Sequence, residues 1–146
     1  MIETVCKNNL EELLPLFRAY QEFYKVADIC DKKNKIFLSQ FGINNSAGCQ
    51  FLYRDSNKVV GFATVYFSFA STIVSKVAIL NDLYTLPEMR GKGIGKKLIE
   101  HCKIFAEKNN AARLQWVTAE DNLQAQQLYD SLNVTRSSWL HYTYNA

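Results

Sequence analysis

Three glycines at alternate positions, in the run Arg90-Gly91-Lys92-Gly93-Ile94-Gly95, constrain the fold of this chain more than any other segment. The residues before them, 77–84, are almost all apolar, which is typical of a buried strand, and Pro87 stops that strand. Apolar residues then recur at helical spacing through positions 94–106. Each glycine inside a helix costs about 1 kcal/mol against alanine, so the glycines are expected in a turn. The segment predicts a strand, a tight loop and a helix.

The start of that helix has the properties of an anion site. The first free N–H groups of a helix point outward at its positive end, where they bind phosphate oxygens. Residues 90–108 carry six basic and two acidic side chains, a net charge of +4. The whole chain has a formal charge of +3, so the remainder carries −1. This local excess favours an anion site over a general nucleic-acid surface. The alternative interpretation is a flexible loop with a solvated helix face.

Two other phosphate-binding loops do not fit. A Walker loop would need glycine at Arg90 and a hydroxyl residue at Lys97. A dinucleotide-binding fingerprint would need glycine at Lys96. A nucleotide-binding role is therefore the weakest of the interpretations considered.

The rest of the chain predicts one domain, residues 1–146, of the α/β (α+β) class. Periodicity predicts helices at 9–24, 31–41, 93–108 and 123–132, with Pro15 marking a kink or boundary in the first. Strands are predicted at 2–6, 49–53, 59–69, 77–84, 114–118 and 139–144. Antiparallel hairpins come first and a strand-helix-strand unit follows, so a mixed sheet with helices on both sides is expected.

Composition excludes several classes of protein and site. No apolar run reaches the roughly 20 residues of a membrane helix, and no secretion signal is expected at the N-terminus. The four cysteines are scattered, so neither a disulfide framework nor a metal site is expected. A cytoplasmic protein with reduced thiols and no nucleic-acid partner is the expectation.

The glycine run resembles the R/Q-x-x-G-x-G/A signature of the GNAT superfamily of N-acetyltransferases, and the resemblance extends over nearly the whole chain. It implies a mostly antiparallel central sheet that splays in the middle, with about four flanking helices, and acetyl-CoA as the cosubstrate. The pantetheine arm would pair with strand backbone, and the pyrophosphate would lie on the loop. The implied cofactor-binding residues are Leu83, Tyr84, Thr85, Arg90, Gly91, Lys92, Gly93, Ile94, Gly95, Lys96, Asn122 and Tyr129.

Within the superfamily, residues 80–84 and Trp139 look most like the polyamine (diamine) and histone-type branch. Two positions depart from the family pattern. Asn81 is neutral where the polyamine branch often has an acid, so this chain departs from that branch at a position that bears on the base and on polyamine specificity. Asn133 stands where the family commonly has glycine, although asparagine also tolerates the left-handed turn.

The resemblance implies chemical roles for a few side chains. Tyr129 matches the tyrosine that protonates the departing CoA thiolate, although on periodicity alone it reads as a core residue. Asp82 is predicted beside the reacting acetyl group at the floor of the acceptor cleft, where it accepts a proton through water or binds the substrate's charge. Glu120 and Asp121 are other acidic candidates. Trp139 would wall an alkyl-ammonium pocket, or else be a buried or interface aromatic.

These observations predict an acetyl-CoA-dependent N-acetyltransferase. The acceptor would be a primary amine of a small cationic, polyamine-like molecule or of a basic peptide lysine, and it would attack directly in a ternary complex. The alternative is a catalytically idle acyl-CoA-binding regulatory module. A homodimer is an expectation of the resemblance alone.

Overall fold

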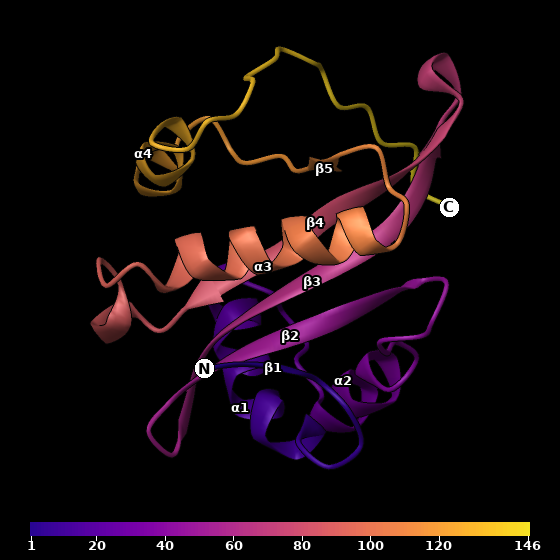
Figure 1. The fold of residues 1–146 in the computed structure, drawn as a ribbon. Coiled ribbons are helices and arrows are strands. Elements are labelled where there is room, and N and C mark those ends of the chain that lie inside the picture. Colours follow the sequence, from indigo (N-terminus) through magenta and orange to yellow (C-terminus); the bar gives the residue numbers. More distant parts are fainter.

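The computed structural model of the chain describes residues 1–146 and contains a five-stranded sheet with helices on both faces (Figure 1). The strands, in chain order, are β1 (Ile2–Thr4), β2 (Gly48–Asp55), β3 (Lys58–Ala70), β4 (Ser75–Thr85) and β5 (Leu114–Gln115). They lie side by side in this same order. Neighbours run antiparallel, except that β5 runs parallel to β4. The predicted fold class, mixed and mostly antiparallel, is confirmed.

Four helices flank the sheet: α1 (Leu10–Phe23), α2 (Asp31–Leu38), α3 (Ile94–Lys108) and α4 (Leu123–Asp130). All four correspond to predicted helices, with ends that differ by a few residues. Pro15 lies inside α1, which continues past it. Short 3₁₀ turns, Ser71–Ile73 and Pro87–Met89, follow β3 and β4.

The sheet separates two hydrophobic cores because successive strand residues point to opposite faces. Phe62 and Ala63 are neighbours in β3 and both are fully buried. Phe62 packs in the core that α1 supplies, and its ring lies 5.8 Å from that of Phe17. Ala63 packs in the core that α3 supplies, together with Leu98. Burial on both faces therefore fixes the register of the central strands.

The pairing between β4 and β5 is short. Only two residue pairs join these strands, Ala78 with Leu114 and Ile79 with Gln115. The predicted strand at 114–118 is thus longer than the observed one. From Leu80 onward, the β4 edge has no neighbouring strand on the β5 side. The sheet splays at this point, as the family resemblance implies.

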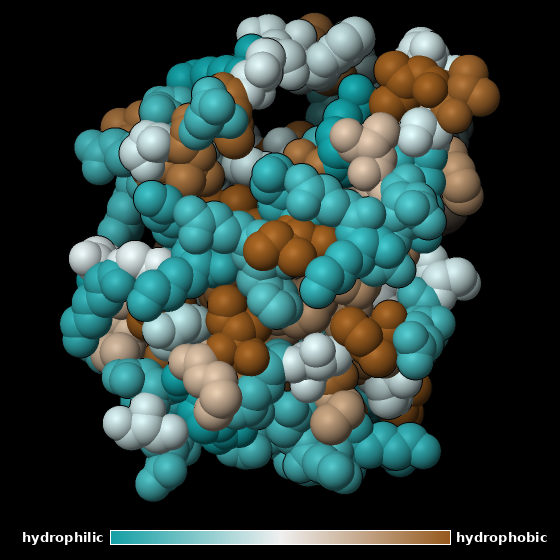
Figure 2. All heavy atoms as spheres, viewed as in Figure 1, coloured by the Kyte–Doolittle hydropathy of each residue, from teal (hydrophilic) through white to brown (hydrophobic).

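The predicted strand at 139–144 is wrong, because residues 133–146 form neither helix nor strand. Strand β5 has only two residues, so it offers no ladder on which a further strand could form. The segment instead runs from α4 towards the tip of the β3–β4 hairpin (Figure 1). The space-filling view shows a hollow beneath this segment (Figure 2).

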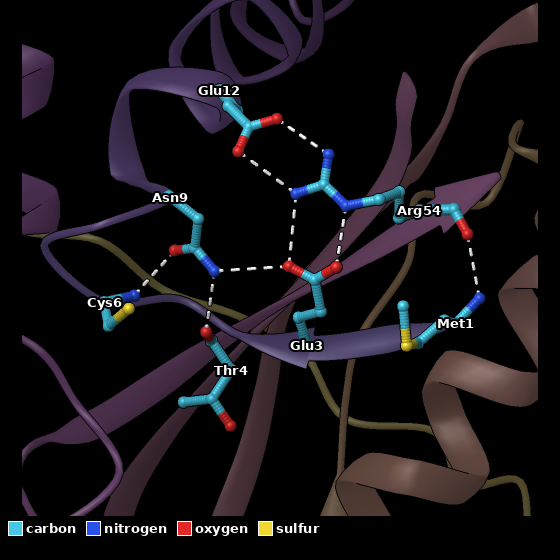
Figure 3. Close-up of polar contacts among 7 residues, drawn as sticks. All are labelled: Met1, Glu3, Thr4, Cys6, Asn9, Glu12 and Arg54. Carbon is cyan, nitrogen blue, oxygen red and sulfur yellow. Dashed lines mark hydrogen bonds and ion pairs between the residues drawn. The ribbon is translucent and has the colours of Figure 1, made fainter. Parts of the chain in front are cut away.

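An ion network holds the N-terminal strand to the sheet and to α1 (Figure 3). The Arg54 guanidinium of β2 donates hydrogen bonds to Glu3 of β1 at 2.7 and 3.1 Å. It also donates to Glu12 of α1 at 2.7 and 3.1 Å. The Met1 amino group donates to the Arg54 carbonyl oxygen at 2.8 Å. Because one planar guanidinium bonds two carboxylates in pairs, it fixes the relative position of three elements.

Candidate functional site

A cavity of about 430 Å³ opens where β4 and β5 separate. Five parts of the chain line it: the end of α1, the second half of β4, the loop before α3, the segment after β5, and α4. Each part contributes at least one lining residue, in the same order: Tyr20, Leu83, Gly93, Trp116 and Tyr129. The splay of the sheet therefore creates the cavity, and the helices, the glycine loop and the segment after β5 complete its wall.

The glycine loop borders one end of the cavity. Gly91 and Gly93 have φ angles of +77° and +79°, the left-handed region that favours glycine. A Cβ atom built on either residue would meet nothing within 4 Å, so backbone conformation rather than packing requires glycine here. Gly95 differs, because its Cβ would lie 3.0 Å from the Leu128 side chain. That third glycine allows α3 to approach α4 closely.

The first turn of α3 presents unpaired amides beside this loop. The Lys97 N–H donates to the Gly93 carbonyl oxygen at 3.1 Å, which is the first bond of the helix. The N–H groups of Ile94, Gly95 and Lys96 come before that bond and have no helical partner. The positive end of the helix and the nearby Arg90 and Lys96 side chains make this region suitable for an anionic group.

The free edge of β4 presents backbone groups to the same cavity. The Leu86 N–H donates to the Val60 carbonyl oxygen at 2.9 Å, and Tyr84 lies opposite Phe62. Directly bonded pairs alternate with unbonded pairs in an antiparallel ladder. The intervening residues, Leu83 and Thr85, therefore turn their N–H and C=O groups away from β3. These groups point to the edge that β5 leaves open, where an extended chain can pair with them.

Arg90 forms a hydrogen bond with one of these backbone groups on the β4 edge. Its Nε donates to the Thr85 carbonyl oxygen at 2.9 Å. Its guanidinium lies 5.4 Å from the ring centres of Phe23 and Tyr84, in cation–π contact with both. The Arg90 charge is thus held beside the cavity by α1 and β4. Both groups of Leu83 and the N–H of Thr85 remain for a ligand.

Tyr129 lines the cavity from α4, and its ring lies 5.4 Å from that of Trp116. Its hydroxyl forms no hydrogen bond with another protein group. Burial raises the pKa of Tyr129, and the nearby Tyr24 raises it further. The hydroxyl is therefore protonated at neutral pH and is able to donate a proton.

Asn122 also lines the cavity, but its side chain has a structural role. It is the N-cap of α4, and its Oδ1 accepts a hydrogen bond from the Ala125 N–H at 3.3 Å. Such a cap stabilises a helix start by about 1 kcal/mol. The amide nitrogen of Asn122 remains for a ligand.

The structure corrects the predicted position of Asp82. Asp82 is only 7% exposed and does not line the cavity. Its Oδ1 accepts hydrogen bonds from the Tyr20 hydroxyl at 2.7 Å and from the Asn81 amide nitrogen at 3.1 Å. Burial raises the pKa of Asp82, and hydrogen bonds to its carboxylate oppose that rise. The carboxylate lies behind the cavity wall because it points towards α1, where Tyr20 binds it.

The other acidic candidates and Trp139 also lie outside the cavity. Trp139 is 89% exposed and does not line it, since the strand that would have carried it does not form. Glu120 and Asp121 are exposed and do not line it either. No aspartate or glutamate is among the lining residues, whereas Arg90 and Lys96 are.

Sequence reasoning missed an aromatic wall on α1. Tyr20, Phe23 and Tyr24 line the cavity opposite α4. Their i, i+3, i+4 spacing on one helix face was a signal for a shared contact surface. It could not show that this surface faces β4.

The structure contains neither a metal site nor a membrane-spanning helix. No group of three or more His, Cys, Asp or Glu side chains is placed to hold a metal ion. None of the helices has both the length and the apolar character needed to cross a bilayer.

Comparisons with known proteins agree with this geometry. The family described as Acetyltransferase (GNAT) family matches residues 10–133. An uncharacterized N-acetyltransferase of Bacillus subtilis (strain 168), YhfO, is 29% identical over 134 residues, which cover 91% of this chain and 89% of that protein. The thialysine N-epsilon-acetyltransferase of Caenorhabditis elegans is 27% identical over 143 residues, covering 93% and 85% of the two chains.

A solved structure has the same fold. The crystal structure of a probable acetyltransferase superposes with a TM-score of 0.87 at 28% identity, covering 100% of this chain and 97% of that one. The GNAT family uses acetyl-CoA. The family match over residues 10–133 shows that this chain belongs to the GNAT family of acetyltransferases.

Proposed function

We propose that this chain is an acetyl-CoA-dependent N-acetyltransferase that acts on a primary amine of a small cationic molecule or of a lysine side chain. One observation carries the proposal. The free backbone groups of Leu83, the free N–H of Thr85 and the unpaired amides at the start of α3 border a single cavity. The first set suits an extended, amide-bearing arm, and the second set suits a phosphate group.

The residues present fit acetyl-CoA as a ligand. The positive φ angles of Gly91 and Gly93 expose backbone amides, and neither residue has a side chain to fill the space beside them. Gly91 to Lys96 would hold the pyrophosphate, Leu83 and Thr85 the pantetheine arm, and Asn122 its amide groups. When bound, acetyl-CoA supplies a thioester whose acetyl carbon accepts an amine.

The proposed reaction assigns one proton transfer to the protein. The acceptor nitrogen bonds to the acetyl carbon, the carbon–sulfur bond breaks, and the sulfur receives a proton from the Tyr129 hydroxyl. This hydroxyl is protonated at neutral pH, so it is available to give its proton to the sulfur as the thiolate forms. The proton that the amine loses passes to water, since no carboxylate lines the cavity, and the Tyr129 phenolate then regains a proton from water.

The nature of the acceptor rests on two supports. Aromatic faces attract cations, and Tyr20, Phe23 and Tyr24 line the end of the cavity near α1. The relative from Caenorhabditis elegans is named for acetylation at the epsilon position of thialysine, which agrees with an amine acceptor. A cationic amine is therefore the class to test first.

Steady-state kinetics over an amine panel tests the proposal. CoA release from acetyl-CoA would be measured with polyamines, lysine peptides, aminoglycosides and acidic amino acids, with an amine-free control. We expect turnover with cationic amines above the amine-free rate. A clear preference for an acidic amino acid would contradict the proposed acceptor class. Binding of acetyl-CoA by calorimetry without turnover would instead favour an idle acyl-CoA-binding module.

A further inference from the structure

Asn81 holds an unusual place in β4. Thr64 of β3 lies opposite Asp82, and the next residue, Val65, lies opposite Leu80. Asn81 is therefore the extra residue of a β-bulge and has no partner on β3. Bulges re-aim a side chain relative to regular alternation. In this case both Leu80 and Asn81 line the cavity, whereas Asp82 is buried behind it.

The Asn81 amide has a defined orientation. Its Nδ2 donates to the Oδ1 of Asp82 at 3.1 Å, and the same oxygen accepts the Tyr20 hydroxyl at 2.7 Å. A carboxylate only accepts hydrogen bonds, so it selects the nitrogen end of the Asn81 amide. The carbonyl end must then point elsewhere, and no protein group donates to it. Because Asn81 is an exposed residue of the cavity wall, this oxygen is free to accept a hydrogen bond from a ligand.

The groups that line the cavity around Asn81 include no carboxylate. The nearby titratable groups are tyrosines from α1, β3, β4 and α4, namely Tyr20, Tyr24, Tyr66, Tyr84 and Tyr129. Asp82 is buried and already accepts two hydrogen bonds, and Arg90 and Lys96 are cations at the loop end.

We propose that Asn81 binds the N–H of the acceptor amine through its amide oxygen, and that Asp82 is a positioning residue that orients this amide with the help of Tyr20. The inference rests on the proposed acetyltransferase function. It replaces direct contact between Asp82 and the substrate with contact through Asn81. With a neutral amide at this place, the amine must lose its proton to water before it attacks, so turnover follows the ionisation of the acceptor itself.

A double-mutant cycle tests the arrangement. The cycle comprises wild type, Asn81→Ala, Asp82→Asn and the double variant, with the KM for the amine and the KM for acetyl-CoA measured separately. Asn81→Ala should raise the amine KM by about two- to tenfold, the loss of one hydrogen bond, and leave the acetyl-CoA KM unchanged. Asp82→Asn should raise the amine KM as well. Its new N–H₂ group is able to donate a hydrogen bond to the Asn81 oxygen, so the Asn81 side-chain amide is free to rotate and exchange the positions of its oxygen and nitrogen.

The amine KM of the double variant should be no higher than that of Asn81→Ala alone, because Asp82 acts through Asn81. Additive effects would overturn the positioning role, and an unchanged amine KM in Asn81→Ala would overturn the binding role. Both substitutions keep or reduce side-chain volume, and thermal melts would verify folding. Tyr20→Phe provides a third variant, which should raise the amine KM by less than Asn81→Ala does.

A pH profile supplies an independent readout. The kcat/KM for two acceptors with different amine pKa values should rise with pH to a midpoint that moves with the acceptor. A midpoint that is the same for both acceptors would reveal an enzyme base and overturn the inference. A wild-type protein that releases no CoA with any amine would overturn the proposed function itself. An active wild type with an unaffected Asn81→Ala variant would overturn this inference alone.

Discussion

Arg90 closes the loop before α3 against the strand that precedes it, because its Nε donates to the Thr85 carbonyl oxygen at 2.9 Å. Arg90, the first residue of the glycine run, thus also bonds a backbone group on the free edge of β4. This bond places the loop and the free strand edge in a fixed relation beside the same cavity. The guanidinium adds a cation–π contact to Phe23 of α1, so three elements meet at one side chain.

Replacement of Gly93 by glutamate should abolish binding of acetyl-CoA. The side chain would project into open space beside the loop, and its carboxylate would repel the pyrophosphate. We expect the affinity measured by calorimetry to fall by about a hundredfold or more, since close like charges cost several kcal/mol. Gly93→Asn separates charge from backbone conformation, because asparagine tolerates the positive φ.

Gly42→Glu is the matched control for added charge, since a Cβ at Gly42 also meets nothing and its φ is not positive. It lies outside the cavity and should bind acetyl-CoA like wild type. Unchanged affinity in a folded Gly93→Glu variant would show that the pyrophosphate lies elsewhere.

Tyr129→Phe should lower turnover by about 10²- to 10⁴-fold, the usual contribution of a positioned acid. The ring and its contact with Trp116 are kept, so acetyl-CoA binding should stay near that of wild type. Steady-state kinetics and calorimetry on the same preparation separate the two effects. Tyr142→Phe, at a residue that is 86% exposed, serves as the control. Full activity in Tyr129→Phe would make Tyr129 a packing residue.

Arg54→Met should weaken the fold and reduce its sensitivity to acid. Hydrogen bonds from Arg54 hold the pKa of Glu3 and of Glu12 below the ordinary value of 4.5. A lowered carboxylate pKa stabilises the folded state above the unfolded pKa, and that stability is lost as pH falls through the folded pKa. Wild-type stability should therefore decline below about pH 4.5, and the decline should be smaller in Arg54→Met.

Urea unfolding between pH 7 and pH 3 measures this dependence. Lys35→Met removes an exposed ion pair with Glu11 and is the control, because such surface pairs contribute little. Equal acid sensitivity in wild type and Arg54→Met would show that the Arg54 network does not control the pH dependence.

Trp139→Ala should change little. The side chain is 89% exposed and lies outside the cavity lining, so the amine KM should equal that of wild type. Thermal unfolding should shift only slightly, because surface substitutions usually change stability by less than about 0.5 kcal/mol. A rise in the amine KM would mean that the C-terminal segment reaches the cleft in solution.

The sequence by itself determined the class of protein and the place of the glycine loop between a strand and a helix. The alternate glycines between an apolar strand and an amphipathic helix are local features, and local geometry fixes what they form. The same holds for the helices, whose apolar residues repeat with the helical period. Tyr129 could be assigned to the cavity because the family motif fixes its position relative to the loop.

Only the tertiary structure decided which side chains face the cleft. A single bulge residue in β4, Asn81, changes the direction of its side chain, and sequence alternation cannot locate such an insertion. Asp82 therefore lies behind the wall, bonded to a tyrosine 62 positions away in α1. Trp139 belongs to no strand because β5 ends after two residues. Strand pairing depends on partners that are distant in sequence, so an apolar alternation alone cannot establish that a strand forms.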